Sequence, residues 1–221
     1  RYPTLSADAR FVAFESNSTE IVPGVSGGIF VRNLMAANTL VVPGTEGGIG
    51  HFPAISADGS HVAWVTGGTT RDVFVTDLRD GTAKKLTPYA DTVNALDGMT
   101  VPAVSRDGRY VAFASRATDL VPNDTNGKCD VFVCDTVSGT ITRVSVSSSG
   151  EEGNGDSPGT SGTFTVLGGG WPTISSDGRY VAFVSSASNL VANDTNATSD
   201  AFIHDTVHHT TTRVSVRTDG S

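Results

Sequence analysis

The sequence is poor in charged residues and contains no long apolar run. Charged residues make up 17% of its 221 residues, against about 25% in typical soluble domains, which argues against long exposed helices. No stretch reaches the roughly 18 apolar residues that predict a membrane span, so we expect no membrane insertion. The net charge of −8 disfavours nucleic acid as a partner, because its backbone binds clustered lysine and arginine.

Cysteine is also scarce. Two residues, Cys129 and Cys134, are too few for a disulfide scaffold. On one extended strand their Cα atoms would be roughly 16 Å apart, whereas a disulfide needs about 4.4–6.8 Å. We therefore expect two thiols and no bridge. The chain starts at Arg1 and not at methionine, so any export signal would lie upstream.

Motifs for catalysis are missing as well. The chain has no Gly-x-Ser-x-Gly elbow, no Walker loop and no dinucleotide fingerprint. Glu151 and Glu152 lie in a polar glycine- and serine-rich stretch, which we interpret as a solvated loop and not as the paired acids of a glycosidase. His204, His208 and His209 could bind a transition metal, but His208 and His209 would lie at a hairpin tip, which favours a solvated surface pair. We predict that the chain is not an enzyme.

Glycine and internal repetition are what the sequence has in abundance. It holds 25 glycines and four similar segments, spaced by about 50 residues except for a longer gap before the last. A period of about 20–50 residues is typical of solenoids, propellers and arrays. The segments open with an apolar residue followed by proline, at Tyr2, Phe52, Val101 and Trp171.

Each repeat predicts four short strands, and no segment has a sustained helical period, so we predict an all-β fold. The second and third strands, 110–115 and 130–134 in the third repeat, are apolar on both faces. Such strands need cover on both sides. Asp107-Gly108 predicts a two-residue type I′ hairpin with positive φ at both residues. The first repeat has Asp8-Ala9 instead, so we expect a different turn there and a degenerate blade.

The repeat has a recognisable signature. Ser-x-Asp-Gly-Arg-Tyr-Val-Ala-Phe occurs at 105–113 and 175–183, followed by an Asp-x-Phe strand and an Arg-Val-Ser-Val strand. This pattern resembles the TolB-like, WD-repeat-like propeller repeats of bacterial periplasmic and secreted proteins. The resemblance implies a β-propeller of four-stranded antiparallel blades, in an extracellular, cell-surface or periplasmic location. The blades are predicted at 1–46, 51–88, 101–146 and 171–217, with an insertion at 147–170.

The sequence does not determine how its four blades are completed into a propeller, because such repeats usually form rings of six to eight blades. The chain is a piece of a longer propeller, a small four-bladed ring, or a unit that pairs or polymerises with other copies. An uncovered terminal blade would expose a large apolar face, and such faces mark interaction surfaces.

Two related loops, 123–130 and 193–200, are candidate calcium sites. Calcium takes oxygen ligands from Asp, Asn and backbone carbonyls within one loop. Asp and Asn also stabilise turns through bonds to their own backbone, and Asp72 holds the last position in a repeat without the rest of the motif, which favours a structural role. The candidate ligands are Asp124, Asn126, Asp130, Asp194, Asn196 and Asp200.

The fold alone fixes no activity. The leading hypothesis is a non-catalytic binding or scaffolding propeller that recognises protein or glycan. The first alternative is a surface protein that assembles into oligomers or filaments through open blade faces. The second is the propeller portion of a larger hydrolase. The insertion at 147–170 is either a recognition loop carried on a rigid scaffold or a solvent-exposed decoration.

Overall fold

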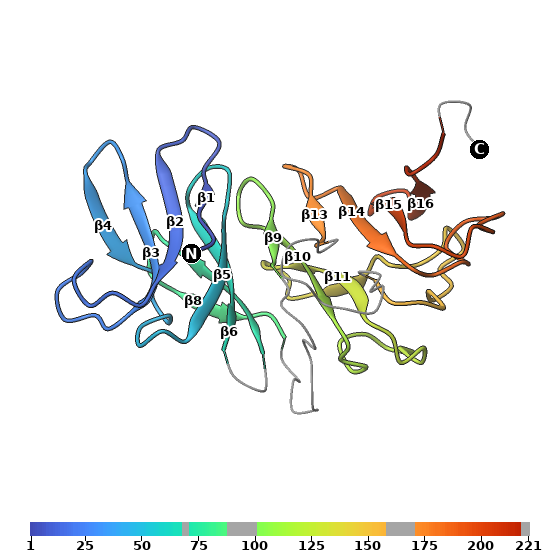
Figure 1. The fold of residues 1–221 in the computed structure, drawn as a ribbon, viewed down its shortest axis with the longest axis horizontal. Coiled ribbons are helices and arrows are strands. Elements are labelled where there is room, and N and C mark those ends of the chain that lie inside the picture. The colour runs from blue at the N-terminus through green and yellow to red at the C-terminus, as the bar shows by residue number, and fades with distance from the viewer. Residues whose placement is uncertain (68–70, 88–100, 158–170, 218–221) are drawn as a thin grey trace.

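The computed structural model describes residues 1–67, 71–87, 101–157 and 171–217, and these form four antiparallel sheets of four strands each (Figure 1). We call the sheets blades 1 to 4. Blades 1 and 2 contain β1 (Thr4–Leu5), β2 (Phe11–Ser16), β3 (Gly28–Asn33), β4 (Asn38–Val41), β5 (Gly50–Ile55), β6 (His61–Thr66), β7 (Val73–Asp77) and β8 (Ala83–Lys85). Blades 3 and 4 contain β9 (Ala103–Val104), β10 (Tyr110–Ser115), β11 (Asp130–Asp135), β12 (Ile141–Arg143), β13 (Thr173–Ile174), β14 (Tyr180–Ser185), β15 (Asp200–Asp205) and β16 (Thr210–Arg213). The predicted all-β fold of four-stranded blades is confirmed.

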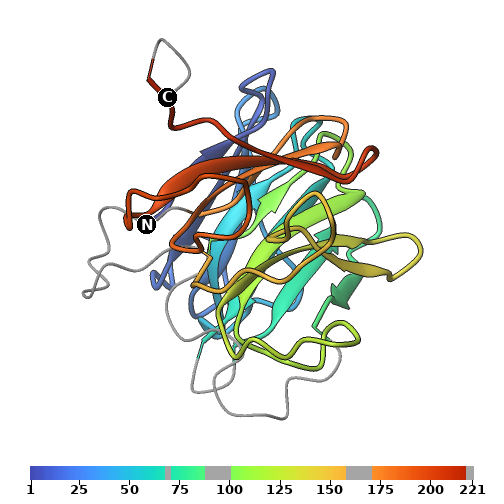
Figure 2. The same ribbon diagram turned by 90° about the vertical axis from the view of Figure 1, so that its right-hand side faces the viewer.

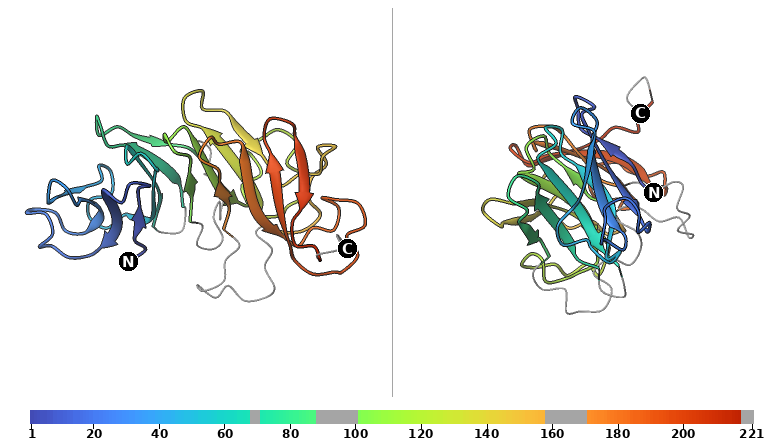
Figure 3. Two further views of the ribbon diagram at one scale, coloured as in Figure 1. Left: turned by 90° about the horizontal axis from the view of Figure 1, so that it is seen from above. Right: turned by 90° about the vertical axis from the view of Figure 1, so that its left-hand side faces the viewer.

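The blades follow one another in an open arc. Figure 1 and the left view of Figure 3 place blade 1 and blade 4 at opposite ends of the long axis. Successive blades are joined at their inner turns by backbone hydrogen bonds, such as Asp58 N to Arg106 O at 3.0 Å and Arg106 N to Ser176 O at 3.0 Å. Of the arrangements that the sequence left open, the closed four-bladed ring is not the one adopted.

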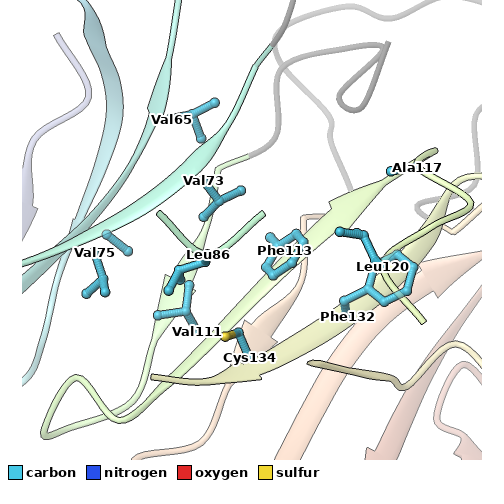
Figure 4. Close-up of a cluster of buried hydrophobic side chains, with 11 residues drawn as sticks. Val65, Val73, Val75, Leu86, Val111, Phe113, Ala117, Leu120, Phe132 and Cys134 are labelled. Carbon is cyan, nitrogen blue, oxygen red and sulfur yellow. The ribbon is translucent and has the colours of Figure 1, made fainter. Parts of the chain in front are cut away.

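The core lies between the blades. Its three apolar clusters each join two successive blades, and Figure 4 shows the one between blades 2 and 3. There Phe113 and Phe132, stacked at 5.9 Å between ring centroids, pack with Val65 and Val73 of the preceding blade. This packing explains why β10 and β11 are apolar on both faces: each face covers a different neighbouring blade.

Within the described residues no blade packs on the outer faces of the two end blades, although Phe30 on the blade 1 face is fully buried. In blade 3, Ala112, Ala114, Val131 and Val133 are buried under blade 4. The equivalent residues of blade 4 are half-buried; they are Ala182, Val184, Ala201 and Ile203. Figure 2 looks at the molecule from the blade 4 end. Blade 4 therefore offers the same kind of small apolar surface that blade 3 uses to bind a blade.

The turn prediction was wrong. In the Asp-Gly pairs that the structure describes, only the glycine has positive φ, +77° at Gly108, and Gly108 N donates to Ser105 O at 3.2 Å. Asp107 accepts bonds from Ser105 Oγ and Arg109 N, so this longer turn is held by side chains. Ala9 adopts the same turn at φ +55°. The expected distortion of the first repeat is therefore absent from this turn.

The turn glycines also touch the preceding blade. A Cβ at Gly178 would collide with the Tyr110 ring, whereas blade 1 accommodates the Cβ of Ala9 at the equivalent position, where no described blade precedes it. We expect Gly178→Ala to lower the free energy of unfolding by about 1–3 kcal/mol through overpacking. Ala9→Gly, the matched reverse change, should have a much smaller effect. Urea unfolding checks both, and equal effects would contradict the blade-contact explanation.

Neither cysteine forms a disulfide, as expected from their spacing. Cys134 is 1% exposed, and burial raises the pKa of its thiol to about 11. The described part of the chain contains no helix long and apolar enough to cross a membrane.

Candidate functional site

The predicted calcium loop of blade 3 is built around an arginine. Arg143 on β12 places its Nη1 3.2 Å from Asp124 Oδ1, 3.4 Å from Asp130 Oδ2 and 2.7 Å from Glu152 Oε1. Only 9% of the arginine side chain is exposed, and Asp130 is fully buried. The guanidinium therefore supplies positive charge where the sequence suggested a cation.

The loop backbone is fixed by its asparagine. Asn126 Oδ1 accepts a bond from Lys128 N at 2.8 Å, and Asn126 Nδ2 donates to Asp130 Oδ2 at 2.9 Å. Asp130 begins β11 and also accepts a 2.5 Å bond from Ser145 Oγ. The turn chemistry that the sequence offered as the alternative to calcium is thus present.

Burial, neighbouring charges and hydrogen bonds shift the pKa values of the acids in this loop in different directions. Burial, with the nearby Asp130 carboxylate, raises the pKa of Asp124 to about 6. Burial also raises the pKa of Asp130. For Glu152, burial acts in the same sense but is outweighed by hydrogen bonds from Thr125 and Arg143, which lower its pKa. Glu152 is therefore the carboxylate that most readily carries charge beside the arginine.

Blade 4 repeats the arrangement with fewer partners. Arg213 Nη1 lies 3.2 Å from Asp194 Oδ1 and 3.7 Å from Asp200 Oδ2, and Asn196 Nδ2 donates to Asp200 Oδ2 at 2.9 Å. Ser215 Oγ donates to Asp200 at 2.5 Å. The sequence-predicted residues therefore form two separate clusters, each with its own arginine that the sequence reasoning missed.

Blade 2 has the same strand-start aspartate without the Asp-x-Asn motif. Asp72 accepts a bond from Thr87 Oγ1 at 3.0 Å and pairs with Lys85 at 3.1 Å. An acid, a hydroxyl and a base therefore recur in three blades at equivalent positions. This recurrence supports a structural role for Asp130 and Asp200.

Calcium at these loops stays a prediction. No three His, Cys, Asp or Glu side chains within the described ranges are arranged to hold a metal ion. Thermal unfolding in EDTA and in millimolar calcium tests the point, because a ligand at about 100 times its Kd adds roughly 2.7 kcal/mol. A rise that Asp124→Ala removes would establish calcium, and an unchanged midpoint would leave Arg143 as the cation.

Residues 151–157, which we call the clasp, correct a second interpretation. Glu151 is exposed, as predicted, but Glu152 is engaged by protein groups: besides Arg143, it accepts bonds from Thr125 N at 2.9 Å and Thr125 Oγ1 at 2.7 Å. Cys129 N donates to Asp156 Oδ1 at 2.9 Å. On the other side, Asn154 N donates to Asn189 Oδ1 at 2.9 Å. The clasp thus joins the loops of blades 3 and 4, while residues 158–170 of the insertion lie outside the described residues.

A further site, which the sequence reasoning missed, lies between blades 1 and 2. Glu15 on β2 is 4% exposed, and its Oε1 lies 3.2 Å from His51 Nδ1. Its other oxygen, Oε2, is buried and has no hydrogen-bond partner in the described part of the protein. The equivalent residues Val65, Ala114 and Val184 are apolar, so the charge at position 15 was the available signal.

The backbone beside this carboxylate is strained. Phe52 has φ +54°, which costs energy for a bulky residue, and the pairing of β5 with β6 shifts register between His51 and Ala54. The rings of Phe52 and Tyr2 meet edge to face at 4.6 Å. These residues line a cavity of about 240 Å³ together with Arg71. Strained backbone of this kind is concentrated at binding and active sites.

The histidines near the last hairpin separate into two environments. His204 on β15 is 2% exposed, and its Nδ1 lies 2.9 Å from Thr211 Oγ1. His208, at the hairpin tip, lies 2.9 Å from Asp205 Oδ2 and 2.7 Å from Arg179 Nη2. His208 and His209 are both exposed, as predicted for a surface pair, whereas His204 is part of the buried blade.

Burial lowers the pKa of His204 from its ordinary value of 6.5, with a further contribution from His209. The unfolded chain therefore binds this proton more readily than the folded chain. The folded state is accordingly destabilised as the pH falls below the ordinary pKa of 6.5 and towards the lowered pKa of His204. His204→Cys introduces the residue that blade 3 has at the equivalent position, Cys134. We expect this variant to lose less stability than the wild type between about pH 7.5 and about pH 5. Urea unfolding at both pH values checks this; equal losses in the two proteins would contradict it.

Comparison with known proteins bears on the fold. No family model and no curated protein matches the sequence. Among solved structures, TolB from Acinetobacter baumannii is 19% identical with a TM-score of 0.56, over 97% of this chain and 43% of that one. This chain is a β-propeller unit. A putative TolB from Agrobacterium tumefaciens is similar at 15% identity and TM-score 0.56, over 95% of this chain and 62% of that one.

The propeller domain of the Trilobed protease from Pyrococcus furiosus is also similar, at 12% identity and TM-score 0.56, over 93% of this chain and 55% of that one. The propeller unit thus spans less than two thirds of each of these structures. The predicted TolB-like propeller repeats are confirmed at the level of fold.

Proposed function

We propose that this β-propeller unit is a binding and scaffolding module of an extracytoplasmic bacterial protein, with a protein or glycan ligand. The observation that carries the proposal is the Glu15 cavity. There a buried carboxylate oxygen without a partner adjoins His51, two aromatic rings and Arg71. Hydroxyl or amino groups of a ligand would satisfy the oxygen, and aromatic rings suit the apolar faces of sugars and side chains.

The cost of Glu15 to the fold supports the same conclusion. A buried acceptor without a hydrogen bond destabilises a protein by about 1–3 kcal/mol, and three other blades hold an apolar residue at this position. Binding sites commonly carry residues that lower stability. We therefore expect Glu15→Val to raise the free energy of unfolding while removing ligand binding.

The experiment has two parts. Urea unfolding compares wild type, Glu15→Val and Glu20→Gln, the last being a matched change of an exposed acid on the same blade. Panels of cell-wall oligosaccharides and of amine-bearing peptides are then screened against wild type and Glu15→Val, which separates the glycan and protein arms. Destabilisation by Glu15→Val, or binding that survives it, would contradict the proposal.

Self-assembly is the second candidate, and complementary end faces favour it. Blade 1 places half-buried Phe14, stacked on the fully buried Phe30 at 5.8 Å between centroids, in the place of the Phe183–Phe202 pair by which blade 4 packs on blade 3. Blade 4 offers half-buried Ala182 and Val184. Head-to-tail contacts of this kind form rings or filaments. Light scattering over a concentration series tests this, and a monomer at every concentration would contradict it.

The propeller portion of a larger hydrolase stays a third hypothesis. It is supported only by likeness of fold to a protease propeller domain, and fold does not determine activity. A nucleophile elbow in the same reading frame would favour it.

A further inference from the structure

The chemistry of the Glu15 cavity specifies which group of a ligand it receives. In the described ranges the ion-pair partner of Glu15 is His51, whose Nδ1 lies 3.2 Å from Oε1. An ionised carboxylate only accepts hydrogen bonds, so this nitrogen carries the proton of the pair. Oε2 is buried and has no hydrogen-bond partner in the same ranges. The cavity therefore contains an unmatched acceptor on a side chain that carries negative charge.

An ammonium group is the donor that suits Glu15 best. A ligand hydroxyl would give Oε2 a hydrogen bond but no countercharge, and Glu15 is 4% exposed. A buried charge without an opposite charge is costly. An ammonium group supplies the proton and the charge together, in a bond that is roughly twice as strong as a neutral hydrogen bond.

The arginines of the cavity narrow the choice of ammonium group. Arg1 and Arg71 both line the cavity, so a ligand that is only cationic would meet like charges. A guanidinium has several N–H donors and can hold a ligand oxygen beside the bonds that it already makes. An α-amino group has such an oxygen close by, in the peptide carbonyl or the carboxylate that follows it, whereas the ε-amino group of lysine has none.

The cavity is small and its walls are fixed. Its volume is about 240 Å³, below the roughly 300–1,000 Å³ of pockets for drug-sized ligands, which suits a single residue. Phe52 and Tyr2 both have positive φ, 54° and 50°, and their rings touch. A Cβ at Gly67 would lie 2.6 Å from His51 Nε2, so the imidazole has little room to turn. Such preorganised walls lower the entropic cost of binding.

We propose that the Glu15 cavity recognises an α-ammonium group together with the carbonyl or carboxylate oxygen beside it, as found at the amino terminus of a polypeptide and in a free amino acid. The ammonium binds Oε2 of Glu15, the oxygen accepts from Arg71, and an apolar side chain packs against the rings of Phe52 and Tyr2. This inference rests on the proposed function, because it names the ligand group of the same cavity.

The probes are Leu-Gly-Gly, N-acetyl-Leu-Gly-Gly, free leucine and N-acetyl-lysine methylamide, each titrated into the intact chain by calorimetry. We expect saturable binding of Leu-Gly-Gly, free leucine or both, and the one that binds more tightly identifies the source of the group. N-acetylation of the peptide should weaken binding at least tenfold, the effect of one charge-assisted bond. The proposal is overturned if neither α-amine binds at millimolar concentration, or if an acetylated probe binds as tightly.

The pH dependence separates the two kinds of amine. The pKa of an α-amino group is about 7.7–8.0 and that of a lysine side chain about 10.4. Raising the pH from about 7 to about 9 should therefore weaken the binding of the α-amine by roughly tenfold. An affinity that stays the same over this range would contradict recognition of an α-ammonium group.

Matched variants connect the binding to the cavity. Glu15→Gln keeps the shape of the side chain and should weaken binding about tenfold, Arg71→Gln should also weaken it, and Glu20→Gln, at an exposed acid of the same blade, should not. Binding that depends on Glu15 but belongs to an oligosaccharide would overturn this inference and leave the proposed function in place. If Glu15→Val destabilises the protein and no probe depends on Glu15, both are overturned.

Discussion

Replacing Arg143 by glutamine is expected to lower the free energy of unfolding by about 3–5 kcal/mol, the usual cost of removing one partner from a buried ion pair. Asp124, Asp130 and Glu152 would be left close together with no cation between them. The first two are almost fully buried, so water can replace the guanidinium only poorly. Arg143 also ties the clasp to blade 3, so its loss should loosen the junction with blade 4.

Urea unfolding at neutral pH in EDTA measures this effect. Arg213→Gln is the matched control: it removes the equivalent arginine from a cluster with one fewer carboxylate and greater exposure, so we expect a clearly smaller loss. If the two variants lose the same stability, the burial of the blade 3 cluster is not what makes Arg143 important.

Replacing Phe113 by alanine is the second change with a large expected effect, about 3–5 kcal/mol for a fully buried aromatic side chain. Phe113 is 0% exposed and packs between blades 2 and 3 (Figure 4). Phe14 occupies the same position of blade 1 but is only half-buried, because no described blade covers it. Phe14→Ala should therefore cost much less.

Thermal and urea unfolding of Phe113→Ala and Phe14→Ala, each measured at several protein concentrations, compare the stability that the two variants lose. If copies associate through the blade 1 face, Phe14→Ala becomes more costly as the concentration rises, whereas Phe113→Ala does not. A loss for Phe14→Ala equal to that for Phe113→Ala at low concentration would mean that something other than a neighbouring blade covers Phe14.

The blades were predictable because their signal is local and repeated. Strands such as β10 and β11 are apolar on both faces, and only cover on both sides explains that pattern. The Asp107-Gly108 turn was mispredicted because hydrogen bonds of the Ser105 and Asp107 side chains decide its geometry, and Ser6 and Asp8 hold the same turn at Ala9. The two-residue hairpin rule considers only the Asp-Gly pair and therefore leaves out the serine two positions before the aspartate.

The candidate site was only partly readable. The acids of the two loops were identified, but Arg143 and Arg213 lie on another strand, and their role depends on strand register. The clasp has no periodicity, and its partners Thr125 and Asn189 belong to different blades. Glu15 was readable in principle, as a charged residue at an otherwise apolar repeat position.

Each sheet takes its four strands from consecutive stretches of sequence, and this has a consequence for how the chain reaches its native state. No blade needs a strand from a distant part of the described chain. Forming a blade therefore requires only short loops to close, and the entropic cost of loop closure is small. Folding rates rise as contacts become more local in sequence. A blade can therefore form as its own segment leaves the ribosome and then act as the template on which the next one condenses.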